Sequence, residues 1–309
     1  MSKRELDAAG ISDPVLRASY EHCRSLNAAH GKTYYLATLL LPAHKRPYVH
    51  ALYGFARYAD EIVDSLDSRL SGAEKAQWLE DWGTAFLKGE TDDQVLPAIH
   101  DTIATWQLPH AHFEAFLDSM RMDLEVTQYQ TFEDLMTYMH GSAAVIGLQM
   151  VPVLEPVRGL EEVAARYARD LGVAFQLANF IRDVGEDLRR GRIYLPVEDL
   201  EHFGVSRAHL QQGVVDGKVR RLLQYEIARN REIFRAAKPG VRLLDPTSRD
   251  CIETATTLYG GILDEVEKAG YRVLDRKVAV PVTRRLRVAV PGLVRARAAR
   301  RTPTSTASA

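Results

Sequence analysis

Two stretches of this chain have the composition of buried helices and yet carry ionisable side chains. They are PYVHALYGFARYADEIVDSL (47–66), which is apolar on nearly every face, and LGVAFQLANFIRDVGED (171–187), which is apolar as far as Arg182. A helix that is apolar on most faces lies in the interior of a protein. A buried carboxylate is costly unless it is paired, protonated or bound to a cation. We therefore expect both segments inside a helical protein that supplies such partners.

Helical spacing of apolar residues continues along the rest of the chain, and no convincing run of alternating strand residues interrupts it. Pro14, Pro42 and Pro109 are placed as the first residues of helices. No linker rich in Pro, Gly or Ser divides the 309 residues, and 46% of them are hydrophobic, so we expect one all-α domain. The predicted helices cover 14–27, 42–66, 73–87, 93–106, 109–127, 132–154, 160–190, 216–236 and 247–269, and 191–205 is predicted to be non-helical.

The sequence indicates neither a membrane span nor secretion. No stretch approaches the ~18 consecutive apolar residues of a transmembrane helix, and residues 1–10 lack the apolar core of a signal peptide. Cys23 and Cys251 lie far apart and outside any metal-binding spacing. We expect them to be reduced core thiols, although two cysteines can in principle pair. The expected location is the cytoplasm.

The net charge of −1 hides a basic C-terminal region. Residues 272–301 contain ten basic side chains and one acidic side chain, interleaved with Val, Ala and Leu. A basic, partly apolar segment with almost no aromatic residues suits an anionic membrane surface rather than nucleic acid. The alternative is a solvated, partly disordered tail, and residues 302–309 have a disordered composition. The predictions are therefore loose membrane attachment or a free tail.

Each of the two apolar helices carries one stripe of polar residues. Residues three or four positions apart lie above one another on a helix. The first stripe consists of Tyr53, Arg57, Asp60 and Asp64, and the second of Gln176, Asn179, Asp183 and Asp187. The aspartates within each stripe are about one turn apart, roughly 6 Å along the axis. Mg²⁺ prefers oxygen ligands and shares its coordination with substrate phosphates, so two facing stripes predict a site for Mg²⁺ ions and a diphosphate.

Other readings of these patterns exist. The 41 acidic residues produce DxxxD spacings by chance, and most such pairs lie on solvated faces. A di-iron bundle also pairs acids on helices, but it requires Glu-x-x-His, and none of the ten histidines follows a Glu at that spacing. Gly185 costs about 1 kcal/mol inside a helix, so we expect a ligand to approach closely there.

In six segments the chain resembles the squalene/phytoene synthase family, and within it the bacterial members of the carotenoid pathway. Together these segments cover most of residues 28–280. They are HGKTYYLATLLLP (30–42), ALYGFARYADEIVD (51–64), SMRMDLEVTQY (119–129), YMHGSAAVIG (138–147), QLANFIRDVGEDLRRGRIYLP (176–196) and LYGGILDEVEKAGYRVLDRKVAV (258–280).

The resemblance implies a fold and a set of site residues. The fold is a class I isoprenoid synthase-type helical bundle with a central cavity, formed by residues 1–280 and followed by a basic tail, 281–309. The catalytic set is Asp60, Asp64, Asp183, Asp187 and Tyr138, with Tyr138 directing the second half-reaction. The ligands of Mg²⁺ or Mn²⁺ are Asp60, Asp64, Asn179, Asp183 and Asp187. The substrate contacts are Tyr53, Arg57, Gln176, Arg182, Tyr259, Arg276 and Thr33, the last standing where family members often have serine.

The implied activity is that of a prenyltransferase which condenses two prenyl diphosphates head to head. Two ionisations, with a cyclopropylcarbinyl diphosphate between them, turn two geranylgeranyl diphosphates into phytoene without a nicotinamide cofactor. The alternatives are squalene or dehydrosqualene formation from farnesyl diphosphate, and a catalytically silent assembly protein, against which the intact aspartates argue. The run RRGR (189–192) is read either as a solvated helix end or as a lid. Expected partners are prenyl diphosphates, a membrane surface and downstream carotenoid enzymes, but no nucleic acid.

Overall fold

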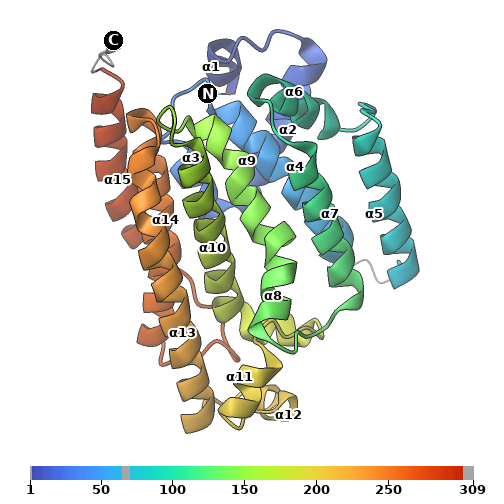
Figure 1. Cartoon of the computed structure of the whole chain (residues 1–309), viewed down its shortest axis with the longest axis vertical. Coiled ribbons are helices and arrows are strands. Elements are labelled where there is room, and N and C mark those ends of the chain that lie inside the picture. Colours follow the sequence, from blue (N-terminus) through green and yellow to red (C-terminus); the bar gives the residue numbers. More distant parts are fainter. Residues whose placement is uncertain (1, 65–69, 302–309) are drawn as a thin grey trace.

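The computed structural model describes residues 2–64 and 70–301, and every regular element in these ranges is a helix (Figure 1). The prediction of an all-α fold is confirmed. The helices are α1 (Ser2–Ala8), α2 (Pro14–His30), α3 (Lys32–Thr38), α4 (Arg46–Asp64), α5 (Gly72–Leu87), α6 (Leu96–Trp106), α7 (His110–Glu125), α8 (Phe132–Met139), the π-helical turn η1 (His140–Ala144), α9 (Val145–Leu154), α10 (Glu161–Arg189), α11 (Val197–His202), α12 (Arg207–Gln211), α13 (Gly217–Ala237), the 3₁₀ turn η2 (Lys238–Leu243), α14 (Pro246–Lys268) and α15 (Val282–Ala299).

Side-chain caps explain where several helices begin. Asp13 Oδ1 accepts a hydrogen bond from the Leu16 amide at 2.9 Å, and Pro14 follows as the first helical residue. Thr131 and Asp134 form a reciprocal capping box at the start of α8. Such caps satisfy amide groups that have no partner within the helix. Helix starts that carry these signals agree with the sequence prediction to within a few residues.

The differences from the predicted helices have local causes. Pro42 does not begin a helix, because α4 starts at Arg46 after a short turn, and the end of the predicted helix 42–66 lies outside the described residues. The predicted helix 132–154 is divided by η1, where a Cβ on Gly141 would lie 2.0 Å from the Ala115 carbonyl oxygen of α7. The segment 191–205, predicted to be non-helical, contains the short helix α11.

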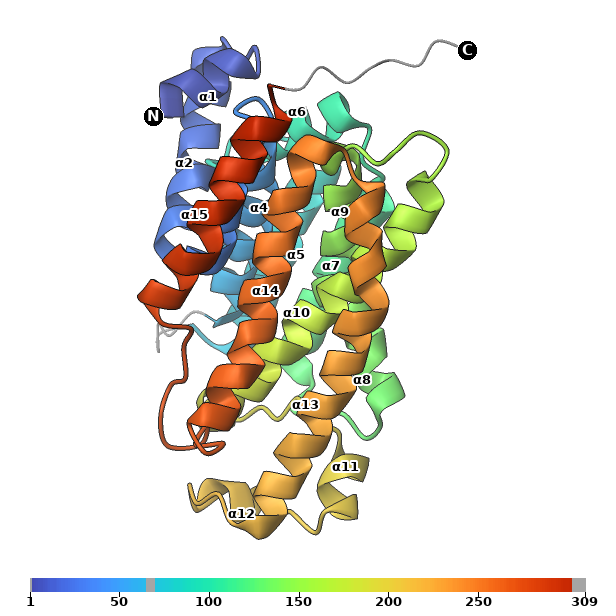
Figure 2. The ribbon, with the colours of Figure 1, turned by 90° about the vertical axis from the view of Figure 1, so that its left-hand side faces the viewer.

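Two of the three hydrophobic clusters formed by the described residues surround the two acidic helices. One core surrounds α4 with α2, α5, α6 and α7, and the other surrounds α10 with α13 and α14. Phe175 of α10 and Ile252 of α14 pack against both cores. Helix α10 runs through the middle of the molecule, in contact with α9, α13 and α14 (Figures 1 and 2). Each of the two acidic helices, α4 and α10, thus lies inside one of these two cores.

The basic C-terminal region includes α15, which lies along α14 (Figure 2). Ala289, Gly292 and Ala296 of α15 are buried in this contact, and a Cβ on Gly292 would lie 2.7 Å from Leu40 Cδ2. The interpretation as a free, solvated tail is therefore wrong for residues 282–299, whereas 302–309 lie outside the described residues. No helix among the described residues has both the length and the apolar composition needed to cross a bilayer.

Candidate active site

The two predicted stripes are the half-exposed faces of otherwise buried helices. On α4, Asp60 and Asp64 have side chains that are 44% and 21% exposed, while Ile62 and Val63 between them are buried. On α10, the Asp183 side chain is 20% exposed and the next residue, Val184, is buried. The carboxylates are thus partly open to solvent, whereas the apolar residues beside them are buried. Asn179, Gln176 and Asp187 are half-exposed as well.

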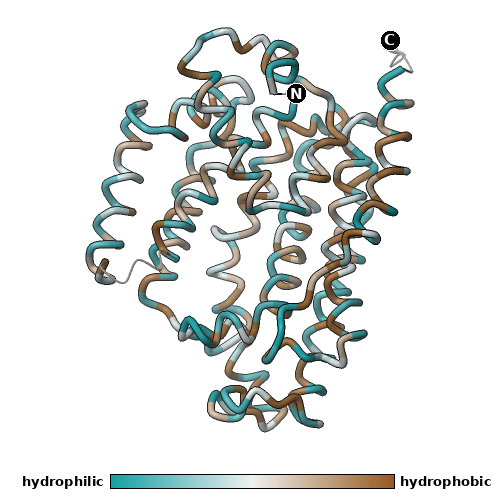
Figure 3. The backbone as a smooth tube through the Cα atoms, turned by 180° about the vertical axis from the view of Figure 1, so that it is seen from behind, coloured by the Kyte–Doolittle hydropathy of each residue, from teal (hydrophilic) through white to brown (hydrophobic). Residues whose placement is uncertain are grey.

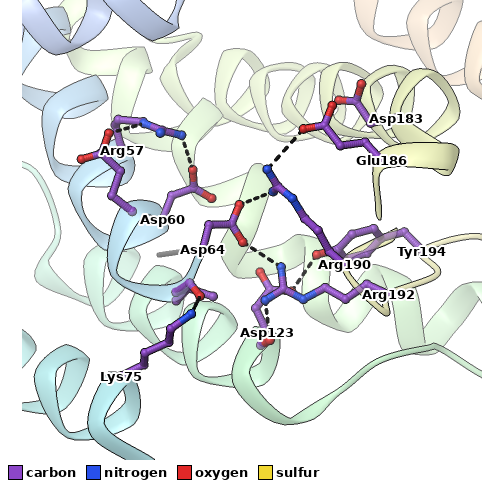
Figure 4. A network of polar contacts seen from close by, with 12 residues as sticks. Arg57, Asp60, Asp64, Lys75, Asp123, Asp183, Glu186, Arg190, Arg192 and Tyr194 are labelled. Carbon is purple, nitrogen blue, oxygen red and sulfur yellow. Dashed lines mark hydrogen bonds and ion pairs between the residues drawn. The ribbon is translucent and has the colours of Figure 1, made fainter. Parts of the chain in front are cut away.

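Arg190, which follows the last residue of α10, links the first stripe to the C-terminal end of α10. Its Nη1 atom lies 2.5 Å from Asp64 Oδ2 on α4, and its Nη2 atom lies 3.2 Å from Glu186 Oε1 on α10 (Figure 4). The charge of Asp64 also contributes to the raised pKa of Asp187. The acidic ends of α4 and α10 therefore lie near each other, and the two-stripe site itself stays a prediction.

Each stripe also has an arginine of its own. Arg57 donates to Asp60 Oδ2 at 2.6 Å and to Glu61 Oε1 at 2.9 Å. Arg182 donates to Asp183 Oδ1 at 2.8 Å. Both guanidinium groups lie beside the predicted diphosphate position, and planar guanidinium groups bind phosphate oxygens in a bidentate manner.

The electrostatics of the stripes fit a divalent cation. Desolvation, together with the charge of Asp64, raises the pKa of Asp60 to about 6. Desolvation, together with the charge of Asp183, raises the pKa of Asp187 to about 7. A bound cation would relieve this repulsion. Within residues 2–64 and 70–301, no three candidate ligand side chains converge on one point, so an ion here requires oxygen atoms from water or phosphate, as Mg²⁺ commonly does.

The segment after α10, which the sequence predicts to be a solvated helix end or a lid, makes contacts that were not assigned to its individual residues. It runs beside the segment after α7, because the Ile193 amide donates to the Thr127 carbonyl at 2.9 Å. Arg192 consequently donates from Nη1 to Asp64 Oδ1 at 3.0 Å and from Nη2 to the Asp123 carbonyl oxygen at 2.9 Å. The run 189–192 is therefore neither wholly solvated nor remote from the site.

Asp123 of α7 is the second unassigned residue. Its carboxylate accepts hydrogen bonds from the Tyr138 hydroxyl at 2.6 Å and the Tyr194 hydroxyl at 2.9 Å. Burial raises the pKa of Asp123, whereas the two hydroxyl donors and the charge of Arg192 act in the opposite direction. The signal in the sequence is the position of Asp123 three residues after Met120, on the apolar face of its helix, where an acid requires a specific partner.

Two of the predicted tyrosines, Tyr53 and Tyr259, pack against neighbouring aromatic rings. Tyr53 of α4 is 5.6 Å from Tyr34 between ring centroids, and Tyr259 of α14 stacks on Phe175 of α10 at 4.3 Å. Desolvation raises the pKa of Tyr259, and the charge of Arg182 opposes that shift. Tyr53 and Tyr259 thus come from different helices to the same inner region. Thr33 lies in the first turn of α3, next to Tyr34.

Arg276 lies in the segment that joins α14 to α15. Its side chain is exposed and donates to the Ala269 carbonyl oxygen at 3.2 Å. The neighbouring Lys277 instead reaches Glu186 of α10, with Nζ 2.8 Å from Oε2. In this structure Lys277, rather than Arg276, is the basic side chain of the segment that contacts the second acidic helix. The diphosphate contact of Arg276 stays a prediction.

An apolar cavity, part of it open to solvent, lies in the interior between α3, α4, α9, α10 and α14. On α10 it is lined by Leu171, Gly172 and Phe175. Asp183 and Asp187 follow on the same helix, about 12 to 18 Å beyond Phe175 at 1.5 Å per residue. The remaining lining side chains are nearly all apolar and include Ile146, Met150, Val241, Leu244, Ile252 and Ala255. The acidic residues are therefore displaced toward one end of an apolar interior.

Gly185 has a structural role. Its amide donates to the Val273 carbonyl oxygen at 3.3 Å, and a Cβ at this position would lie 2.5 Å from the carbonyl oxygens of both Val273 and Leu274. The expectation that a ligand approaches Gly185 is wrong, because the backbone after α14 occupies that space.

Similarity to known proteins agrees with this geometry. Residues 27–285 match the squalene/phytoene synthase family. The chain is 39% identical to a 15-cis-phytoene synthase of Synechocystis sp., over 87% of this chain and 82% of that protein. It is 37% identical to the 15-cis-phytoene synthase of Synechococcus elongatus, over 88% and 91% of the two chains.

Solved structures share the fold. A dehydrosqualene synthase superposes with a TM-score of 0.81 at 27% identity, covering 92% of this chain and 98% of the other. The squalene synthase of Alicyclobacillus acidocaldarius superposes with a TM-score of 0.74 at 28% identity, covering 85% and 98%. The isoprenoid synthase-type helical bundle with a central cavity is thus confirmed. By sequence, by fold and by the pairing of two acidic helices, this chain belongs to the squalene/phytoene synthase family.

Proposed function

We propose that this protein is a prenyltransferase that condenses two geranylgeranyl diphosphate molecules head to head, through a cyclopropylcarbinyl diphosphate, to phytoene, with release of diphosphate. The observation that carries this proposal is the placement of two facing acidic stripes at one end of an apolar cavity. The 15-cis-phytoene synthases to which the chain is 37% to 39% identical support the choice of product. The intact aspartates argue against a silent assembly protein.

The side chains of the stripes provide for diphosphate departure. Asp60, Asp64, Asp183 and Asp187, with Asn179, are the proposed ligands of Mg²⁺ or Mn²⁺. When bound, the metal ions supply positive charge that stabilises the leaving diphosphate. Arg57 and Arg182 are proposed to exchange their carboxylate partners for diphosphate oxygens, which orients the bond that breaks.

The apolar cavity provides the second requirement, which is the exclusion of water. An allylic carbocation that meets water becomes an alcohol. The cavity walls consist mostly of aliphatic and aromatic side chains such as Ile146, Leu171 and Phe175, which keep water away from the cation. Tyr53 and Gln176, the first residues of the two stripes, and Tyr259 are proposed to hold the first carbons of the substrate.

Product analysis tests this function. The full chain is incubated with Mg²⁺ and either geranylgeranyl or farnesyl diphosphate, with and without NADPH. We expect phytoene from geranylgeranyl diphosphate, with no requirement for NADPH. A C30 product from farnesyl diphosphate, with geranylgeranyl diphosphate unreactive, would favour the dehydrosqualene or squalene alternative. Both superposed structures are of enzymes that carry those names. Turnover of neither substrate would contradict a prenyl-condensing function.

We further propose that the outer face of α15 rests on an anionic membrane surface, where the hydrocarbon product enters lipid directly. Four aliphatic residues recur every four positions on this face and are 50% to 63% exposed: Val282, Leu286, Val290 and Val294. The inner arginines of α15 are neutralised by α14, as in the ion pair of Arg284 with Asp264. By contrast, no carboxylate of the described residues lies within ion-pair distance of Arg287 or Arg297. Figure 3 shows the resulting alternation of apolar and polar residues along this helix.

Liposome sedimentation tests the membrane proposal. Truncation before α15 would expose the surface of α14, so point variants are the sharper probe. We expect Leu286→Ser with Val290→Ser, or Arg287→Gln with Arg297→Gln, to reduce binding to anionic vesicles at least fivefold, and added salt to weaken binding by the intact chain. Val15→Ser, at an exposed valine of α2, is the control. Equal binding by all variants would place the membrane contact elsewhere.

Contact with downstream carotenoid enzymes is a related proposal, since they consume the same lipid-borne product.

A further inference from the structure

The surroundings of Asp123 supply a hydrogen-bond donor to each of its carboxylate oxygens. Asp123 is only 8% exposed, yet each of its two oxygens accepts a hydrogen bond from a tyrosine hydroxyl. A carboxylate with both oxygens accepting has the arrangement of an ionised acid. Arg192 adds a positive charge on the same side, since it binds the Asp123 carbonyl oxygen. The buried negative charge is therefore shared with the two phenol groups of Tyr138 and Tyr194.

These phenol groups belong to an aromatic cluster beside the second stripe. The ring of Tyr194 lies parallel to that of Phe180, with centroids 4.0 Å apart, and the Tyr138 ring is 5.7 Å from the Tyr194 ring. Phe180 directly follows Asn179 of the stripe on α10. The faces of aromatic rings attract cations, and a phenol that donates a hydrogen bond to a carboxylate becomes more electron-rich. The network therefore places polarised rings beside the second stripe, where the Phe180 ring follows Asn179 and the charge of Asp187 acts on Tyr194.

Arg192 joins this cluster to the proposed metal site. It contacts Asp64 with one guanidinium nitrogen and the Asp123 carbonyl oxygen with the other (Figure 4). The charge of Asp123 also contributes to the electrostatic environment of Asp60. The aromatic cluster and the first stripe are thus two parts of one connected assembly, although α7 carries no residue of either stripe.

We propose that Asp123 is a positioning residue, which fixes and polarises Tyr138 and Tyr194 so that their rings stabilise the carbocation and direct it toward the second carbon–carbon bond rather than toward release or capture by water. Asp123 acts through the two tyrosines and does not touch substrate. This inference rests on the proposed condensation of prenyl diphosphates. It assigns to one carboxylate a role that neither stripe provides.

The test compares the distribution of products, which a loss of fold alone would leave unchanged, and measures binding at the proposed metal site separately. The full chain and the variants Asp123→Asn, Tyr138→Phe and Tyr194→Phe receive geranylgeranyl diphosphate and Mg²⁺. Diphosphate release, phytoene, the cyclopropylcarbinyl diphosphate and prenyl alcohols are quantified together. Tyr129→Phe is the matched control, because the Tyr129 hydroxyl is buried nearby and has no hydrogen-bond partner among the described residues.

We expect Asp123→Asn to lower phytoene per diphosphate released at least tenfold and to raise the share of intermediate and alcohols correspondingly. Tyr138→Phe and Tyr194→Phe should each cause part of this shift, and Asp123→Asn should add little in a Tyr138→Phe background, because the two residues act as a unit. The Tyr129→Phe control should retain the wild-type distribution. Binding of inorganic diphosphate with Mg²⁺, measured by calorimetry, should stay within twofold of wild type in Asp123→Asn.

Three outcomes would overturn the inference. They are an unchanged product distribution in Asp123→Asn at lower total turnover, a parallel loss of diphosphate binding that accounts for the whole effect, and an equal shift in Tyr129→Phe. Failure of the proposed substrate is distinguishable from these. If the wild-type chain converts farnesyl but not geranylgeranyl diphosphate, the ratio of C30 product to diphosphate released is measured instead. That ratio in Asp123→Asn then decides the role of Asp123.

Discussion

Arg192 Nη1 lies 3.0 Å from Asp64 Oδ1, although the two residues are 128 positions apart in the chain. Arg190 reaches the other oxygen of the same carboxylate at 2.5 Å. Two guanidinium groups from the segment after α10 thus meet the acidic stripe of α4. A metal ion that binds Asp64 must compete with both guanidinium groups. Metal binding is therefore coupled to the conformation of residues 190–192.

Removing one of these competitors should strengthen metal binding. A partly exposed ion pair stabilises by about 1 kcal/mol or less, so we expect Arg190→Ala to raise the affinity for Mg²⁺ up to about fivefold. Calorimetric titration of Mg²⁺ in the presence of inorganic diphosphate measures this change. Arg189→Ala, at the exposed preceding residue, should have no effect. Weaker Mg²⁺ binding in Arg190→Ala would instead make Arg190 a diphosphate contact in the bound state.

The four stripe aspartates should be required for turnover and dispensable for folding. We expect Asp60→Ala, Asp64→Ala, Asp183→Ala and Asp187→Ala each to lower kcat at least 100-fold, since removal of one preorganised charge contact commonly costs about that much. Circular dichroism should show an intact helical fold. Asp118→Ala, at an exposed site of α7, is the control. Near-normal activity of Asp60→Ala or Asp183→Ala at saturating Mg²⁺ would remove the two-stripe site.

The raised carboxylate pKa values predict opposite effects of pH on stability and on metal binding. The pKa of Asp60 is about 6 and that of Asp187 about 7 in the folded chain, against about 3.9 in an unfolded chain. Between about pH 4 and pH 7 the folded state therefore binds more protons than the unfolded state, and without metal these groups lower the free energy of unfolding as pH rises. Mg²⁺ needs the deprotonated carboxylates, so its affinity should increase over the upper part of this window.

Urea unfolding and Mg²⁺ titration between pH 5.5 and 8 measure the two effects. The stability loss with rising pH should shrink in Asp187→Asn, which cannot ionise at that position. Affinity for Mg²⁺ that stays constant across this range would contradict protonation of the stripes.

The depth of the apolar cavity should decide which prenyl chain is accepted. Ala255 of α14 is buried and lines the cavity. An extended chain advances about 3.5 Å for every three bonds, so the four extra main-chain bonds of a geranylgeranyl group need about 5 Å more depth than a farnesyl group. We expect Ala255→Phe to shift the ratio of kcat/KM values at least tenfold toward farnesyl diphosphate. Thr257→Phe, at an exposed site of the same helix, should leave the ratio unchanged, and a shift in this control would contradict the steric explanation.

The sequence determined the features that arise within single helices. Most of the long helices and both stripes could be predicted, because residues three or four positions apart on a helix always share a face. Tyr53, Arg57, Asp60 and Asp64 lie together for this local reason. The apolar faces of the same helices indicated that they pack inside, and the resemblance to a known family supplied the chemistry.

Only the tertiary structure decided how these elements meet. Gly185 admits the backbone of Val273 and Leu274, α15 covers α14, and Asp123 holds two tyrosines from elements that follow it in the chain. None of these contacts has a periodic signal, because each depends on the relative placement of segments whose spacing in sequence is arbitrary. The physical reason is that forming a helix determines only which side chains of that helix lie next to one another. The ion pair of Arg192 with Asp64 forms only when the whole core has packed.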